Sequence, residues 1–116
     1  MKQLMFLILL FISSISYSQL IISNHVALHD INASQVLTEK YENNIFIFSD
    51  SYITVKYATQ LTDTYAVVSK DEEDNTYTYK TVDKNGEVVY FFLSAGSIGI
   101  MPQRYISRNY LLIFRI

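Results

Sequence analysis

Residues 76–93, TYTYKTVDKNGEVVYFFL, decide the fold of this chain. Two runs rich in Tyr, Thr, Val and Phe, residue types that favour β-strands, flank the turn-forming residues Asp-Lys-Asn-Gly at 83–86. The dipeptide Asn85-Gly86 is typical of a type I′ turn, because both residue types tolerate the positive φ angles that this turn requires. The stretch therefore predicts a β-hairpin whose two-residue loop is Asn85 and Gly86.

A two-residue loop also predicts which residues pair across the hairpin, with Tyr79 opposite Phe92. One face then carries Tyr77, Tyr79, Thr81, Val88, Tyr90 and Phe92, and the other carries Thr76, Thr78, Lys80, Val82, Val89, Phe91 and Leu93. Neither face is polar, whereas a sheet with one face in water alternates cleanly. Something must cover the second face: a helix, a second layer of sheet, a partner chain or a ligand. The predicted interaction face consists of Val89, Phe91 and Leu93, extended by Leu111 and Ile113 of the last strand.

Further strand patterns lie on both sides of the hairpin. Apolar and β-branched residues recur in residues 20–22, 26–28, 45–48, 53–57, 65–69, 97–101 and 110–116, separated by short polar gaps. This spacing predicts an all-β fold with minor α content, an antiparallel β-meander of about six to eight short strands. Such a meander forms a half-closed barrel or a small sandwich.

One short amphipathic helix is expected near residues 34–42. Val36, Leu37 and Tyr41 would share a helical face, and Ser34 or Asn32 would cap the first turn. This helix is one candidate to cover the second face of the hairpin.

The first 18 residues have the pattern of a secretory signal peptide. Lys2 precedes an apolar run at 4–12, and the small residues Ser16 and Ser18 follow. The apolar run is shorter than the roughly 20 residues that a spanning helix needs. We therefore expect cleavage after Ser18 and a single exported β domain at 19–116, periplasmic or extracellular and from a bacterial envelope, that does not span a membrane after cleavage.

Composition limits the partners and the chemistry. The chain has 9 Lys and Arg against 11 Asp and Glu, and this mild balance does not favour nucleic acid, which requires a strongly basic surface. It has no cysteine, so the fold depends on packing and hydrogen bonds rather than on disulfides. We expect no cofactor.

His25 and His29 are the only histidines. On a helix their spacing would bring both rings over one metal ion, but on a strand it separates them by about 13 Å at about 3.3 Å per residue. No third ligand is evident nearby, so we expect two ordinary histidines and no metal site. The four acids at 71–74 predict a solvated hairpin tip, since calcium loops need alternating oxygen ligands and a glycine.

Arg104, Arg108 and Arg115 give the end of the chain a positive charge, and no acidic residue follows Glu87. Arginine binds phosphate and carboxylate groups through a planar fork of N–H donors. The three arginines are therefore candidates for an anion-binding site, although solvated side chains are the commoner explanation of such a set.

No catalytic motif is evident: the sequence has no Gly-x-Ser-x-Gly elbow, no glycine-rich phosphate loop and no cysteine nucleophile. We therefore expect a non-catalytic binding or interaction module, such as an inhibitor or adaptor, whose partner is another protein or a second copy. The alternative is a small β-barrel carrier of an apolar ligand, for which cavity size is the discriminator. A less favoured class is an enzyme that uses His25 or His29.

Overall fold

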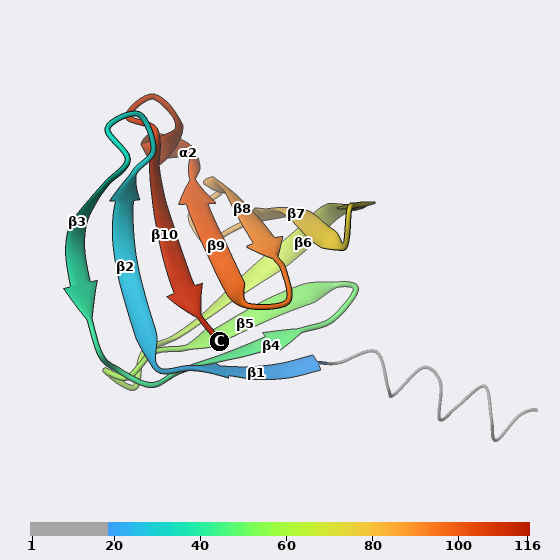
Figure 1. The fold of residues 1–116 in the computed structure, drawn as a ribbon. Coiled ribbons are helices and arrows are strands. Elements are labelled where there is room, and N and C mark those ends of the chain that lie inside the picture. The colour runs from blue at the N-terminus through green and yellow to red at the C-terminus, as the bar shows by residue number, and fades with distance from the viewer. Residues whose placement is uncertain (1–18) are drawn as a thin grey trace, which may run out of the picture.

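A computed structural model describes residues 19–116 and places them in one curled antiparallel sheet with a short helix (Figure 1). The all-β prediction with minor α content is confirmed, as is the half-closed barrel, although the sheet has ten strands rather than six to eight. The predicted leader and its cleavage site fall outside the described residues. No helix within residues 19–116 has the length and apolar character to cross a membrane.

The strands are β1 (Gln19–Ser23), β2 (His25–Asp30), β3 (Gln35–Lys40), β4 (Asn44–Phe48), β5 (Tyr52–Lys56), β6 (Thr62–Glu73), β7 (Thr76–Val82), β8 (Val88–Leu93), β9 (Ser97–Pro102) and β10 (Tyr110–Arg115). The helix α2 (Gln103–Ile106) follows β9. Their order in the sheet is β1-β4-β5-β6-β7-β8-β9-β10-β2-β3. Strands β4 to β10 form a meander, and β1 and β3 are the two edges.

A sharp corner between β1 and β2 curls the sheet. These consecutive strands lie at the first and ninth positions of the sheet, so the chain joins its two ends at Asn24 (Figure 1). The buried side chain of Ser23 fixes this corner, because its Oγ lies 2.7 Å from the Arg115 carbonyl oxygen and 3.0 Å from that of His25. In Figure 1, β1, β4 and β5 therefore cross beneath the upright strands β9, β10, β2 and β3.

Aromatic side chains join the two halves of the curled sheet into one core. The ring of Phe46 in β4 lies edge-on to Phe114 in β10, with centroids 4.9 Å apart. Phe91 in β8 contacts Tyr65 at 4.9 Å and Phe48 at 6.2 Å. Edge-to-face pairs of this kind are each worth about 0.5–1.5 kcal/mol beyond burial. They help the chain to pack without disulfides.

The expected helix at 34–42 is wrong, because residues Gln35–Lys40 form strand β3 beside β2. Val36, Leu37 and Tyr41 are all exposed, so the supposed apolar face covers nothing. Ser34 adopts a left-handed φ of 51° that reverses the chain. A short segment gains more backbone hydrogen bonds from the free edge of β2 than from an isolated helix, whose nucleation is costly.

The 76–93 hairpin forms, but its predicted register is off by one residue. Tyr79 lies opposite Phe91 and Val82 opposite Val88, because the loop contains three residues, 84–86. The carbonyl of Asp83 accepts the N–H of Gly86 at 3.1 Å, and only Gly86 in this loop has positive φ, at 82°. This is a type I turn with a glycine bulge rather than a type I′ turn.

The Asp83 side chain explains why the longer loop forms. Its Oδ1 accepts the backbone N–H groups of Asn85 at 2.9 Å and Glu87 at 2.8 Å. Aspartate commonly caps turns in this way, and both bonds require the three-residue loop. A slip of one residue moves every side chain of a strand to the opposite face, so β8 is turned over relative to the prediction.

The second apolar face is therefore part of the core. Val89, Phe91 and Leu93 are buried, and the opposing half of the sheet covers them. They do not form an exposed interaction face in this structure. Leu111 and Ile113 point to the other side of the sheet, where both are partly exposed. There Phe92 and Leu111 pack over Gly99, at which an added Cβ would lie 3.3 Å from each side chain.

Candidate functional site

A cleft of about 410 Å³ opens between the two halves of the curled sheet. One wall is apolar and is formed by Val89 of β8, Ile100 of β9 and Leu112 of β10. The opposite wall contains Tyr65 of β6 and Tyr57 from the turn that follows β5. A volume of this size lies within the range of about 300–1,000 Å³ that is usual for small-molecule sites.

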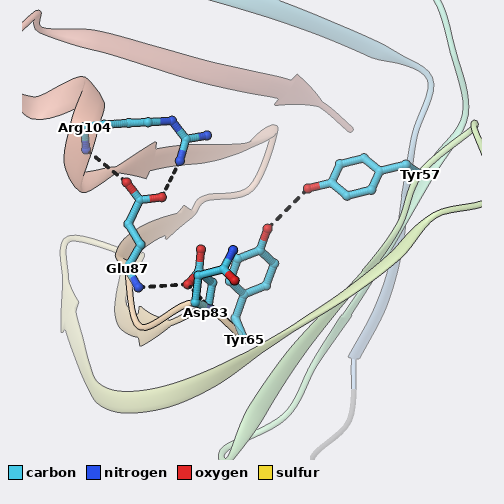
Figure 2. A network of polar contacts seen from close by, with 6 residues as sticks. Tyr57, Tyr65, Asp83, Glu87 and Arg104 are labelled. Atoms are coloured by element: carbon cyan, nitrogen blue, oxygen red, sulfur yellow. Dashed lines mark hydrogen bonds and ion pairs between the residues drawn. The ribbon is translucent and has the colours of Figure 1, made fainter.

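Two tyrosine hydroxyls meet in this cleft. The Oη atoms of Tyr57 and Tyr65 are 3.4 Å apart and point toward each other (Figure 2). Burial raises the pKa of both hydroxyls above the usual value. For Tyr65, the hydrogen bond with Tyr57 and the charge of Asp63 raise the pKa further. Both groups are thus protonated at neutral pH and act as hydrogen-bonding groups rather than as nucleophiles.

Charged side chains form the rim of the cleft. Arg104 of α2 pairs with Glu87 through its guanidinium, and its backbone N–H donates to Glu87 Oε2 at 3.3 Å (Figure 2). Lys84 Nζ lies 3.8 Å from Asp63 Oδ1. Among the described residues, these two ion pairs leave the carboxylate of Asp83 as an unneutralised negative charge at the rim. The rim therefore favours a neutral or cationic group over an anion.

Two similar turns hold the rim in place. The Tyr57 N–H donates to the Leu61 carbonyl at 2.9 Å and Gln60 adopts φ 69°, the same pattern as at Asp83, Gly86 and Glu87. The turn after β5 thus uses glutamine where the other uses glycine. Leu61 lies exposed at the mouth of the cleft. Backbone hydrogen bonds thus close both turns at the rim.

The three candidate anion-binding arginines are not brought together. Arg104 pairs with Glu87, and Arg108 lies in the exposed turn after α2. Arg115 lies at the end of β10 that is farther from α2, where it pairs with His25 of β2. Five residues, or roughly 17 Å of strand, separate it from the start of β10. The three arginines do not form one anion site.

The histidines lie on strand β2, where their spacing separates them. His25 is buried and its Nε2 lies 2.7 Å from Glu39 Oε1 of β3. Tyr41 donates to the same oxygen at 3.2 Å, and these two hydrogen bonds lower the pKa of Glu39. Within residues 19–116, no group of His, Asp and Glu side chains has the arrangement of a metal site. The cluster ties β3 to β2.

The acidic residues at 71–74 lie on the hairpin that joins β6 to β7. Asp74 and Asn75 form its two-residue loop, with φ angles of 51° and 63°. The type I′ geometry predicted for residues 85–86 thus occurs here instead. The tip is exposed, as its charge predicts.

Sequence patterns alone did not reveal the cleft. Tyr57 and Tyr65 come from different strand ends, and only the curl of the sheet brings their hydroxyls together. Comparisons with known proteins find no similar family, curated protein or solved structure.

Proposed function

We propose that this protein is an exported, non-catalytic binding protein that holds a small ligand in the cleft between the sheet halves. The observation that carries the proposal is the pair of tyrosine hydroxyls set 3.4 Å apart in a cleft of about 410 Å³ with one apolar wall. Concave sites with apolar walls and a few fixed polar groups are the usual form of ligand sites. Export is supported by the sequence of residues 1–18 alone.

The chemistry of the cleft favours a small aromatic amine. Tyr57, Tyr65 and Leu112 line the cleft and offer surface against which a flat ring can pack, while the carboxylate of Asp83 at the rim attracts a positive charge. The tyrosine hydroxyls accept or donate one further hydrogen bond. This ligand is less apolar than the one expected from the sequence, because hydroxyls and carboxylates share the lining.

An inhibitor or adaptor role loses its main support. It depended on an uncovered face made of Val89, Phe91 and Leu93, and these side chains are buried. An enzyme using His25 or His29 is also less favoured, since neither histidine lines the cleft.

The proposal can be tested by NMR titration with 2-phenylethylamine and with phenylacetate, which have similar size and opposite charge. We expect the amine to shift the signals of Tyr57, Tyr65 and Leu112 in a saturable way, and the acid to bind at least tenfold more weakly. Leu112→Trp fills the cleft and should weaken binding of the amine at least tenfold. Leu111→Trp is the matched control, because the adjacent residue points to the other face.

Two results would contradict the proposal. In one, neither probe shifts the cleft signals at millimolar concentration. In the other, Leu112→Trp binds the amine as the wild type does while circular dichroism shows an intact sheet.

A further inference from the structure

The outer face of β1, β4 and β5 carries apolar side chains that the fold leaves uncovered. Leu20 and Ile22 of β1 are 62% and 56% exposed, and Ile47 of β4 and Tyr52 of β5 are exposed beside them. Leu20 is the direct cross-strand neighbour of Ile47. We call these four side chains the β1 patch. Contiguous exposed apolar side chains of this kind usually mark an interaction site.

Strand β1 is also an edge of the sheet. It pairs only with β4, so backbone N–H and C=O groups on its other side have no strand partner among residues 19–116. Unpaired groups of this kind accept a further β-strand. The natural occupant of this surface is therefore an extended strand with apolar side chains on one face.

The two edges of the sheet differ in how they are protected. Strand β3 carries the charged residues Glu39 and Lys40, and its pairing with β2 shifts register between Leu28 and His29. Charges and bulges are the usual means by which edge strands avoid pairing. Strand β1, Gln-Leu-Ile-Ile-Ser, has no charge, no proline and no register shift. Of the two edges, only β1 lacks these protective features.

We propose that β1 pairs with β1 of a second copy of this chain, antiparallel about a two-fold axis. β1 is itself the kind of strand that this open edge would accept, because it is uncharged and carries apolar residues at alternate positions. Identical strands pair antiparallel with self-complementary contacts, so Leu20 lies next to the partner's Ile22 on the outer face. The charges on β3 prevent head-to-tail pairing of β1 with β3, so the assembly closes as a dimer.

This dimer leaves the cleft free. The β1 patch is on the outer face of the sheet, whereas Tyr57, Tyr65 and Leu112 line the inner side. Each copy keeps its own ligand site, and the two proposals fail or succeed independently.

The test is the solution mass of the full chain, as recovered from expression, across a concentration series by analytical ultracentrifugation. We expect the wild type to reach twice the mass of its own chain. Ile22→Lys introduces a charge on the open edge and should raise the dimer dissociation constant at least tenfold. Val36→Lys is the matched control, because Val36 is 47% exposed on β3, the opposite edge of the sheet, and it should dimerise normally.

A second measurement and a second variant keep the result decisive. Hydrogen exchange of the β1 backbone amides should slow as the dimer forms, and if Ile22→Lys fails to fold by circular dichroism, Leu20→Lys replaces it. A wild type that stays monomeric at about 1 mM would overturn the proposal, as would Ile22→Lys or Leu20→Lys dimers of unchanged affinity. A monomer that instead binds neutral phosphatidylcholine vesicles through the patch would also overturn it.

Discussion

Asp83 and Gly86 determine how the central hairpin is built. The Asp83 carboxylate accepts two backbone N–H groups, and Gly86 supplies the single left-handed φ that the three-residue loop needs. An L-residue with a Cβ in that conformation costs about 1–2 kcal/mol. The Gly86 site has open space around an added Cβ, so the backbone angle alone sets this cost.

Gly86→Ala should therefore lower the free energy of unfolding by about 1 kcal/mol, measured by urea denaturation. Gly96→Ala is the matched control, because Gly96 also has open space and does not adopt positive φ. That variant should be neutral or slightly stabilising, since alanine restricts the unfolded chain. Equal losses of stability in the two variants would contradict the assigned turn.

Gln60 shows why single turns are hard to predict. It holds φ 69° in a turn with the same hydrogen bonds as the Asp83 turn, yet glutamine carries no turn signal. Its conformation follows from the neighbouring strands β5 and β6, which the turn must join. For this reason, the turn at the mouth of the cleft could not be predicted from the sequence.

At the scale of elements, strand positions followed from residue type, whereas strand faces did not. Residues 45–48, 76–82 and 97–101 were all predicted within a residue or two of β4, β7 and β9. The faces of β8 depended on one loop residue, and both faces are apolar, so the pattern could not correct the error. The predicted helix does not form, because pairing with the open edge of β2 stabilises this segment more than its weak helical periodicity does.

The register of β8 leads to a direct comparison of neighbouring phenylalanines. Phe91 is fully buried among the aromatic core, whereas Phe92 is only partly buried on the outer face. Phe91→Ala should lower the free energy of unfolding by about 3–5 kcal/mol, and Phe92→Ala by clearly less. Urea denaturation of both variants measures the difference. A greater loss of unfolding free energy from Phe92→Ala than from Phe91→Ala would contradict the observed register and support the two-residue loop predicted from the sequence.

Strand β3 is fully exposed, and the hydrogen bond between Glu39 and His25 ties it to β2. Hydrogen bonds lower the pKa of Glu39 from 4.5, so its stabilising contribution is present above that value and is lost as the pH falls through the lowered pKa. Glu39→Gln should thus be less stable than the wild type at neutral pH, with a difference that shrinks in acid.

Chemical denaturation at neutral and acid pH measures this difference. Glu72→Gln is the control, since Glu72 is exposed on β6 and makes no ion pair in the described residues. A stability difference for Glu39→Gln that does not change with pH would show that the carboxylate charge does not hold β3.

For the whole molecule, the corner at Asn24 has the largest consequence. It places β1 across the open side of the meander, so that the two halves of one sheet enclose the core (Figure 1). The same corner leaves β1 as an unprotected edge. The cleft and the proposed dimer surface thus lie on opposite faces of one curled sheet, and neither could be inferred from local sequence patterns.

Export and cleavage after Ser18 stay predictions from the sequence of residues 1–18, which lie outside the described residues. We expect the exported protein to begin at Gln19, as measured by intact mass and N-terminal sequencing. Large residues at the small-residue positions, Ser16→Phe with Ser18→Phe, should leave the precursor uncleaved, whereas Gln19→Glu should not. Exported protein that retains residues 1–18 would contradict the predicted cleavage after Ser18.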